Sequence, residues 1–314
     1  MKKIKGPNFF SVGQDKAGTS ALFGMLKQHP EIFIPERREP SYFAKDVEKE
    51  EEKAGIKRSH FFFKDWEDYI ALFKTAKNEK AIGDMSNSYL RSKEAPKLIH
   101  KYKPSSRIII ILREPVDWLI SVYHQLQRSE ETHYNSFVEA LSKNKKTELI
   151  KKRFPRSYMG DYLEKTDYAS YLENYTKTFP KKQIKIILYD DFKSDPRKIL
   201  KEIFEFLGVD DSFVPEILRA NVSKSVKNMA LKKISDIDFI VGLRQFSKRH
   251  IPEKIWSKIS QTYEKIIYKK GKESVPEEFK SKLRQEITPN VIRLSKFFKK
   301  NKLSEKDPRE IWRY

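Results

Sequence analysis

The sequence predicts an α/β fold in which a parallel sheet is flanked by helices and followed by a helical C-terminal extension. Two observations support this prediction. Short β-branched or aromatic runs alternate with amphipathic segments through the first two thirds of the 314 residues, as in sheets whose strands are joined by helices. The run Ile108 to Leu112 is apolar without alternation, as in a central parallel strand that is buried on both faces.

The expected strands are short, rich in Ile, Phe and Val, and bounded by turn residues. They are Asn8 to Val12, Lys80 to Ile82, Arg107 to Leu112 and Gln183 to Leu188. Amphipathic segments lie between and after them, and these are expected to form helices. They are Thr19 to Gln28, Lys93 to Lys101, Val116 to Arg128, Ser136 to Lys143, Tyr168 to Thr178 and Pro196 to Leu207.

The chain after about residue 221 loses the strand signals. It is expected to form Lys-rich helices with Pro252, Pro276 and Pro289 near their starts, since proline is favoured in the first helical turn. We therefore expect one domain over residues 1–314, with an α/β core at about 8–210 and a helical extension at about 221–314.

The composition limits the classes of function. A formal net charge of +21 from 65 Lys and Arg against 44 Asp and Glu attracts phosphates, sulfates, nucleic acid or anionic membranes. Because the lysines are spread along the whole chain, solvated helix faces are the simpler interpretation. The absence of cysteine excludes disulfides, thiolate nucleophiles and cysteine-based metal sites. No apolar run approaches the ~18 residues of a membrane span.

The segment Phe9 to Leu22 passes from the first strand through a glycine-bounded turn into a helix. Gly13, four residues, Gly18 and Thr19 match most of the phosphate loop G-x-x-x-x-G-K-[ST], but the lysine lies earlier, at Lys16. Backbone N–H groups and the helix start can still bind phosphate. The altered spacing argues against ordinary ATP chemistry beside magnesium. The sequence thus predicts a P-loop-like phosphate site, and the alternative is a tight turn with a chance lysine.

A second motif follows the apolar strand, where Arg113 precedes Pro115 and a new helix. Arg113 is expected at the carboxyl edge of the sheet, where ligands of open α/β sheets bind. A cation placed there is a candidate anion contact. Ser121 lies eight residues further on, and its hydroxyl is expected to reach the same phosphate. The alternative for Ser121 is an ordinary solvent contact.

Several motifs in this order resemble the sulfotransferases that use 3'-phosphoadenosine-5'-phosphosulfate (PAPS), in particular the bacterial and heparan-sulfate-type branch. The similarity covers roughly residues 8 to 210. Its motifs are KAGTS at Lys16, LKQHPEIFIP at Leu26, REPSYF at Arg38, GDMSNSYL at Gly83, LREP around Arg113 with Ser121, and FPKKQIKIILYDDFKSDPRKILKEIFEFLGV at Phe179.

The resemblance implies roles for the two phosphate motifs. It implies that Lys16 stabilises negative charge on the leaving phosphate, and that Arg113 and Ser121 hold the 3'-phosphate that distinguishes PAPS from other nucleotides. It assigns the 5'-phosphate to backbone N–H groups and hydroxyls of Ala17, Gly18, Thr19 and Ser20. PAPS is then a cosubstrate, PAP is the product without its sulfonyl group, and no metal is expected.

The resemblance also implies a catalytic base. A glutamate just before an apolar-aromatic pair serves as base in the glycan-sulfating branch, and Glu39 occupies that place. From the residues alone, an ordinary surface carboxylate beside two arginines is the simpler interpretation of Glu39. Phenol and steroid sulfotransferases use a histidine instead, and none of His29, His60, His100 and His124 matches that role. His29, before a proline, is expected to donate or accept a local hydrogen bond in a turn.

The chain departs from the family pattern near the acceptor. Heparan-type relatives often carry lysine at the place of Met85 and proline at that of Asn87. Asp84 is expected either to contact acceptor hydroxyls or to cap the following turn. Lys224, in the segment Asn221 to Lys227, is the candidate for a basic loop that closes over the nucleotide.

The sequence therefore predicts an enzyme of the EC 2.8.2 type that sulfates a hydroxyl or amine of a glycan or small-molecule acceptor. Two alternatives remain. One is a P-loop kinase or ATPase, which is distinguished by its dependence on magnesium. The other is a non-catalytic basic protein that binds nucleic acid or polyanions, which is distinguished by a steep salt dependence of binding.

The short apolar stretch after Met1 to Lys5 does not resemble a signal peptide. A cytoplasmic location is expected, with no nucleic-acid partner and no membrane span.

Overall fold

The computed structural model of the chain describes residues 4–53, 62–128, 134, 136–144, 162–218, 224–226, 262, 266, 268–270, 275–304 and 306–314. The chain forms two compact units. The first comprises Met1–Leu119, Asp161–Ala220 and Lys280–Tyr314, and the second comprises Ile120–Gly160 and Asn221–Phe279. Residues of the predicted C-terminal extension are therefore divided between the two units.

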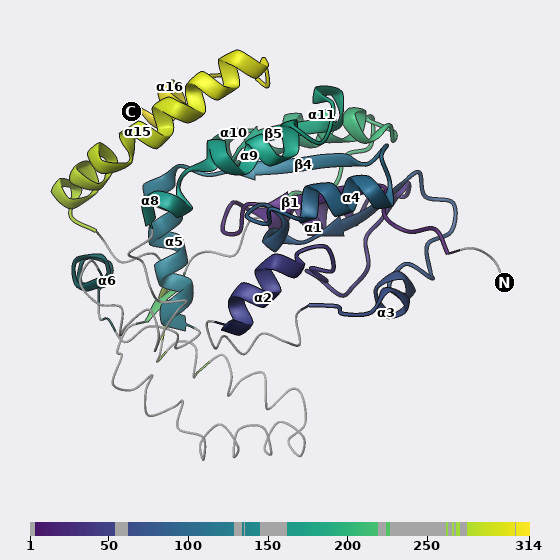
Figure 1. Cartoon of the computed structure of the whole chain (residues 1–314), viewed down its shortest axis with the longest axis horizontal. Helices are drawn as coiled ribbons and strands as arrows, with labels where there is room; N and C mark the ends of the chain where they lie inside the picture. Colours follow the sequence, from purple (N-terminus) through teal and green to yellow (C-terminus); the bar gives the residue numbers. More distant parts are fainter. Residues whose placement is uncertain are drawn as a thin grey trace. The chain divides into compact units, whose positions relative to one another are not determined.

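The first unit contains a five-stranded sheet of order β2-β3-β1-β4-β5 in which every pairing is parallel (Figure 1). The strands are β1 (Phe9–Gly13), β2 (Ile32–Phe33), β3 (Ala81–Met85), β4 (Arg107–Leu112) and β5 (Ile184–Leu188). The predicted α/β fold with a parallel sheet is confirmed. The strand β2 was missed because its two residues are too few to show a pattern.

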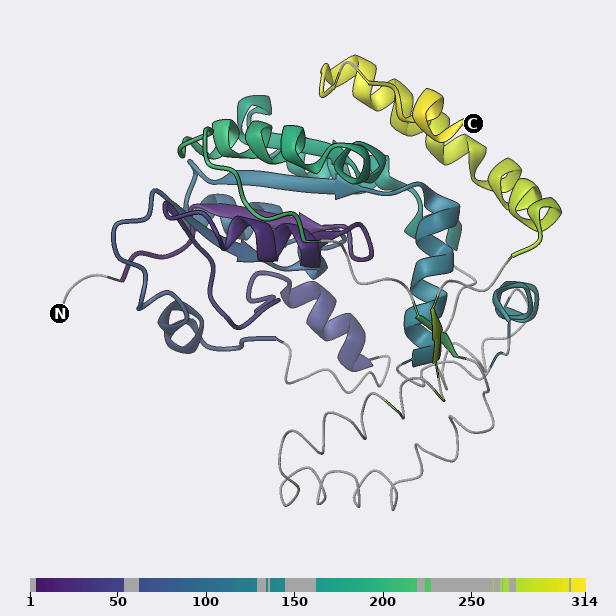
Figure 2. The same cartoon turned by 180° about the vertical axis from the view of Figure 1, so that it is seen from behind.

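Helices flank both sides of this sheet (Figures 1 and 2). The first unit has α1 (Thr19–Leu26), α2 (Lys45–Lys53), α3 (Trp66–Ala71), η1 (Asn87–Tyr89), α4 (Ala95–Tyr102), α8 (Tyr162–Lys165), α9 (Tyr168–Thr176), η2 (Lys181–Gln183), α10 (Tyr189–Ser194), α11 (Pro196–Leu207) and α16 (Pro308–Trp312). The second unit has α6 (Phe137–Asn144), β6 (Lys224–Val226) and β7 (Tyr268–Lys270). The helices α5 (Pro115–Arg128) and α15 (Glu277–Asn301) contribute residues to both units.

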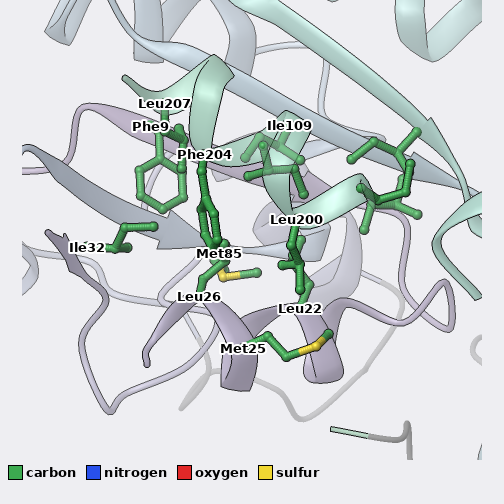
Figure 3. Packing of buried hydrophobic residues seen from close by; sticks show 14 of the residues in the cluster. Phe9, Leu22, Met25, Leu26, Ile32, Met85, Ile109, Leu200, Phe204 and Leu207 are labelled. Carbon is green, nitrogen blue, oxygen red and sulfur yellow. The ribbon is translucent and has the colours of Figure 1, made fainter. Parts of the chain in front are cut away.

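Both faces of the central strands are covered by side chains. One face packs against α1 and α11 in a cluster that includes Phe9, Leu22, Met25, Ile109, Leu200 and Phe204 (Figure 3). Phe10, Ile108 and Ile110 are fully buried but lie outside this cluster. Since successive side chains of a strand point to opposite faces, the unbroken apolar run of β4 is explained by burial on both sides.

Further details of the prediction from sequence need correction, and the short helices α3, α8 and α10 were also not predicted. The helix α2 was missed because its sequence, KDVEKEEEK, has no apolar stripe. The paired strands β6 and β7 lie where only helices were expected, because three-residue strands rich in lysine show no alternation. Pro289 lies inside α15 rather than near a helix start, whereas Pro276 directly precedes that helix. Pro252 lies outside the described residues.

Among the described residues, we find no helix with the length and apolar content of a membrane span.

Candidate active site

The loop after β1 leads into α1 through two residues in the left-handed region, Lys16 at φ 60° and Gly18 at φ 85°. A Cβ on Gly18 would lie 3.1 Å from the Tyr189 ring, so both the backbone angle and the space favour glycine. The first helical N–H groups that bond back to the Gly18 carbonyl are those of Ala21 and Leu22. The amides before them belong to the open start of the helix, which favours an anion.

The other residues predicted for the 5'-phosphate lie on the same turn. Ala17 is fully buried, and its N–H donates to the Gln14 carbonyl at 3.3 Å. Thr19 is buried at the first position of α1, and Ser20 follows it with an exposed side chain. Arg38 Nη2 donates to the Ser20 hydroxyl at 2.7 Å. This contact joins the start of α1 to the segment that carries Glu39.

Arg113 lies directly after β4, at the carboxyl edge of the sheet, and is only 7% exposed. Its Nη1 donates to the Lys16 carbonyl at 2.8 Å, and its Nη2 lies 3.6 Å from the Asp117 carboxylate. The guanidinium is 4.9 Å from the centre of the Tyr189 ring. Among the described residues, nothing accepts a hydrogen bond from the buried Nε. A buried cation with an unused donor is suited to an anionic ligand.

Gln14 is part of this arrangement, although the sequence did not single it out. Its Oε1 accepts from the Arg113 backbone N–H at 3.3 Å, and its Nε2 donates to the Tyr168 hydroxyl at 3.0 Å. On the next residue, the Asp15 carbonyl accepts from Trp118 Nε1 at 3.1 Å. These contacts connect the loop after β1 with the loop after β4. A glutamine directly after the first glycine of the turn is the one sequence signal that could have indicated them.

Glu39 lies in the loop before α2, where Glu39 and Ser41 both have positive φ angles, of 53° and 56°. Asn87 Nδ2 donates to Glu39 Oε1 at 2.9 Å. The Ser41 N–H donates to Ser86 Oγ at 3.0 Å, and the Ser88 hydroxyl donates to Ser41 Oγ at 2.8 Å. The loop with the predicted base is therefore held against the segment at the end of β3.

Asp84 lies in β3 and is fully buried. Its Oδ1 accepts from the Ser86 hydroxyl at 2.7 Å, and its Oδ2 accepts from Tyr69 at 2.9 Å and Tyr89 at 2.7 Å. Burial raises the pKa of Asp84 to about 6, the hydroxyl donors oppose this rise, and the charge of Glu39 adds to it. A fully buried carboxylate presents no surface to an acceptor. Of the two roles expected from the sequence, an acceptor contact or a cap of the following turn, the hydrogen bond from the Ser86 hydroxyl favours the second, and we propose that Asp84 positions this turn.

The remaining predicted residues lie on other elements. Ser121 is 5% exposed within α5, and the backbone of Lys224 opens β6; both belong to the second unit. Met85 is buried in the cluster between the sheet and helices α1 and α11 (Figure 3). His29 accepts the Glu31 N–H at 3.0 Å, which confirms the local hydrogen bond expected for it. Within the described ranges, no cluster of acidic and histidine side chains could hold a metal ion.

Comparisons with known proteins identify the family of the chain. A profile of the sulfotransferase domain matches residues 7–285. The human bifunctional heparan sulfate N-deacetylase/N-sulfotransferase 3 is 32% identical over 211 residues, which are 65% of this chain and 22% of that protein. Human carbohydrate sulfotransferase 15 is 25% identical over 251 residues, covering 65% of this chain and 44% of that protein. The chain therefore spans less than half the length of these curated relatives.

A solved structure is also similar. The crystal structure of a sulfotransferase from Alicyclobacillus acidocaldarius has 29% sequence identity and a TM-score of 0.60, and the match covers 81% of this chain and 100% of that chain. This agreement in fold and the domain profile, which covers most of the sequence, confirm the resemblance found in the motifs. The chain belongs to the sulfotransferase domain family.

Proposed function

We propose that the chain transfers a sulfonyl group from PAPS to a hydroxyl or amine of a carbohydrate acceptor. The observation that carries this proposal is Arg113. It is a buried guanidinium at the carboxyl edge of the sheet, bonded to the carbonyl of Lys16, and its Nε has no acceptor among the described residues. A bidentate cation at this place suits the 3'-phosphate of PAPS. Neither ATP nor AMP carries that group.

The phosphate loop supports the other end of the nucleotide. The open start of α1, with the hydroxyls of Thr19 and Ser20, is assigned to the 5'-phosphate. The ammonium of Lys16 is assigned to the oxygen that bridges sulfur and phosphorus, where it stabilises negative charge as that bond breaks. Ser121 and Lys224 are proposed as further phosphate contacts.

The proposed transfer is a single in-line displacement. Glu39 removes the proton from the acceptor hydroxyl, whose oxygen then attacks sulfur. The bond between sulfur and the bridging oxygen breaks, and its electron pair remains on the 5'-phosphate of PAP. Glu39 passes the proton to solvent. Asn87 keeps the Glu39 carboxylate oriented through its hydrogen bond, and the buried Asp84 keeps Ser86 and the loop in place.

The acceptor class rests on the relatives. Human relatives named as heparan sulfate and carbohydrate sulfotransferases match this chain over 65% of its length. We therefore propose a glycan or a small molecule with a similar hydroxyl. Desulfated heparan sulfate and a simple sugar glycoside are the first acceptors to assay with labelled PAPS.

Calorimetric titration tests the nucleotide assignment. The protein is titrated without magnesium with PAP, 5'-AMP and ATP, and the PAP titration is repeated with Arg113→Ala and with Arg197→Ala, an exposed arginine of α11. We expect PAP to bind at least roughly tenfold more tightly than the others, and only Arg113→Ala to remove that difference.

The outcomes separate the competing functions. Equal binding of the three nucleotides, or binding of ATP that requires magnesium, contradicts the sulfotransferase activity and favours a kinase or ATPase. Binding of nucleic acid that falls steeply with salt, without any nucleotide binding, favours the non-catalytic basic protein.

A further inference from the structure

The segment after α15 turns back beside that helix (Figure 1) and ends in contact with Glu114, the residue after Arg113. Trp312 at the end of α16 is 4% exposed, and its Nε1 donates to Asp190 Oδ2 at 3.0 Å. Lys306 pairs with Asp191. These two carboxylates directly follow Tyr189, whose ring lies against the Arg113 guanidinium. The segment therefore fixes the start of α10, on which Arg113 rests.

A second contact reaches the residue after Arg113. The Tyr314 hydroxyl donates to Glu114 Oε1 at 2.5 Å, and Glu114 Oε2 accepts the Asp117 N–H at 2.5 Å at the start of α5. Glu114 is 7% exposed. Burial raises the pKa of Glu114, and the hydrogen bond from Tyr314 opposes that rise. Because Asp117 also faces Arg113 Nη2, the Tyr314 hydroxyl helps to fix the turn that orients the guanidinium.

A third contact reaches the loop after β1. The Trp312 ring meets the Tyr168 ring edge-on, with centroids 6.2 Å apart. The Tyr168 hydroxyl accepts from Gln14 Nε2, and Gln14 Oε1 accepts from the Arg113 N–H. Contacts from one segment thus lead by three routes, two of them through Trp312, to the surroundings of a single arginine.

We propose that Lys306, Trp312 and Tyr314, here called the α16 clamp, position Arg113 and thereby set the affinity for the 3'-phosphate of the nucleotide. This inference rests on the proposed function, in which Arg113 binds that phosphate. The clamp residues act through Tyr189, Glu114 and Gln14, so they are positioning residues. Their effect is expected on nucleotide binding and not on the chemical step, because the contacts described above lead to Arg113 and its neighbours.

The test compares two nucleotides that differ in the 3'-phosphate. Tyr314→Phe removes one hydroxyl, and Trp312→Phe removes the indole donor while keeping an aromatic ring. For both variants we expect the affinity for PAP to fall roughly 3- to 10-fold, the range of one ordinary hydrogen bond, because each substitution acts on Arg113 indirectly. The affinity for 5'-AMP stays as in the wild type. In turnover, KM for PAPS rises by the same factor and kcat is unchanged.

Arg313→Ala, which alters an exposed side chain of the same segment, is the control and should leave both affinities unchanged. A parallel loss of PAP and 5'-AMP binding, or a lower kcat at unchanged KM, shows a general structural role and overturns the proposal. The proposal is also overturned if both variants bind PAP as the wild type does, while Arg113→Ala abolishes the preference for PAP. If the wild type shows no preference for PAP, the proposed function fails first, and this inference fails with it.

Discussion

Arg113, directly after β4, and Asp84, within β3, are both buried ionisable residues beside strand β1, but their surroundings differ. Arg113, at the end of β4, has one donor without an acceptor among the described residues, and its other contacts are to a carbonyl, a carboxylate and an aromatic ring. Asp84, inside β3, has three hydroxyl donors on its two oxygens. The Nε donor of Arg113 can bind a ligand, whereas the Asp84 carboxylate already accepts three hydrogen bonds and holds the residues that donate them in place.

The two sides of the site should therefore respond to different measurements. Substitutions around Arg113 are expected to change nucleotide affinity. Substitutions around Asp84 and Glu39 are expected to change stability or turnover while nucleotide affinity stays constant. This distinction would fail if a substitution near Asp84 or Glu39 changed nucleotide affinity, or if one near Arg113 changed turnover at saturating PAPS.

The largest effect is expected for Glu39→Gln. An amide keeps the shape of the side chain but cannot accept the acceptor's proton, so kcat should fall about 10²- to 10⁴-fold, with PAP affinity unchanged in calorimetry. Glu36→Gln, an exposed neighbour in the same segment, is the matched control and should retain wild-type turnover. A full loss of PAP binding in Glu39→Gln would instead assign Glu39 a role in nucleotide binding.

Asp84→Asn tests the buried carboxylate through pH. The pKa of Asp84 rises from 3.8 to about 6 on folding, chiefly through burial. Below pH 3.8 the carboxyl is protonated in both the folded and unfolded states, and its contribution to stability is fully present. As the pH rises to about 6 the unfolded chain releases the proton first, so stability is lost by on the order of 3 kcal/mol.

Asparagine does not titrate, so the free energy of unfolding of the wild type should fall relative to Asp84→Asn between pH 3.8 and about 6. Urea unfolding of both proteins across this range measures the difference. A difference that does not change with pH contradicts the interpretation of Asp84 as a desolvated carboxylate.

Arg113→Lys tests whether a positive charge alone is enough to bind the 3'-phosphate. Lysine keeps the charge but lacks the planar fork that reaches the Lys16 carbonyl and lies against Tyr189. We expect PAP affinity to fall about tenfold, with kcat at saturating PAPS nearly unchanged. Arg197→Lys is the control. Retention of full PAP affinity would mean that charge alone holds the 3'-phosphate.

The smallest effect is expected for Asn87→Ala, which removes the donor to Glu39 Oε1. Without it the carboxylate is less well oriented, and kcat should fall roughly 2- to 5-fold while KM for PAPS stays constant. Steady-state kinetics with varied PAPS measures both values. An increase in KM for PAPS alone would assign Asn87 to nucleotide binding.

Motifs with a fixed backbone requirement were predicted well from the sequence. The turn from β1 to α1 requires glycine at position 18 because φ is positive there, and β4 was predicted with its observed bounds because a strand buried on both faces needs an unbroken apolar run. The candidates for binding phosphate follow from these two motifs: Lys16 lies in the turn after β1, and Arg113 follows β4. Family membership could be read from their order.

The partners of these residues became known only with the fold. The sequence was enough to place a cation after the central strand, but not to show that Gln14, Tyr189 and a segment about 200 residues away surround it. It indicated Asp84 but not its burial beneath two tyrosine hydroxyls. Backbone geometry and apolar periodicity are local properties of the chain and can be recognised in a short stretch of residues. Hydrogen bonds between distant side chains depend instead on how the sheet brings its strands together.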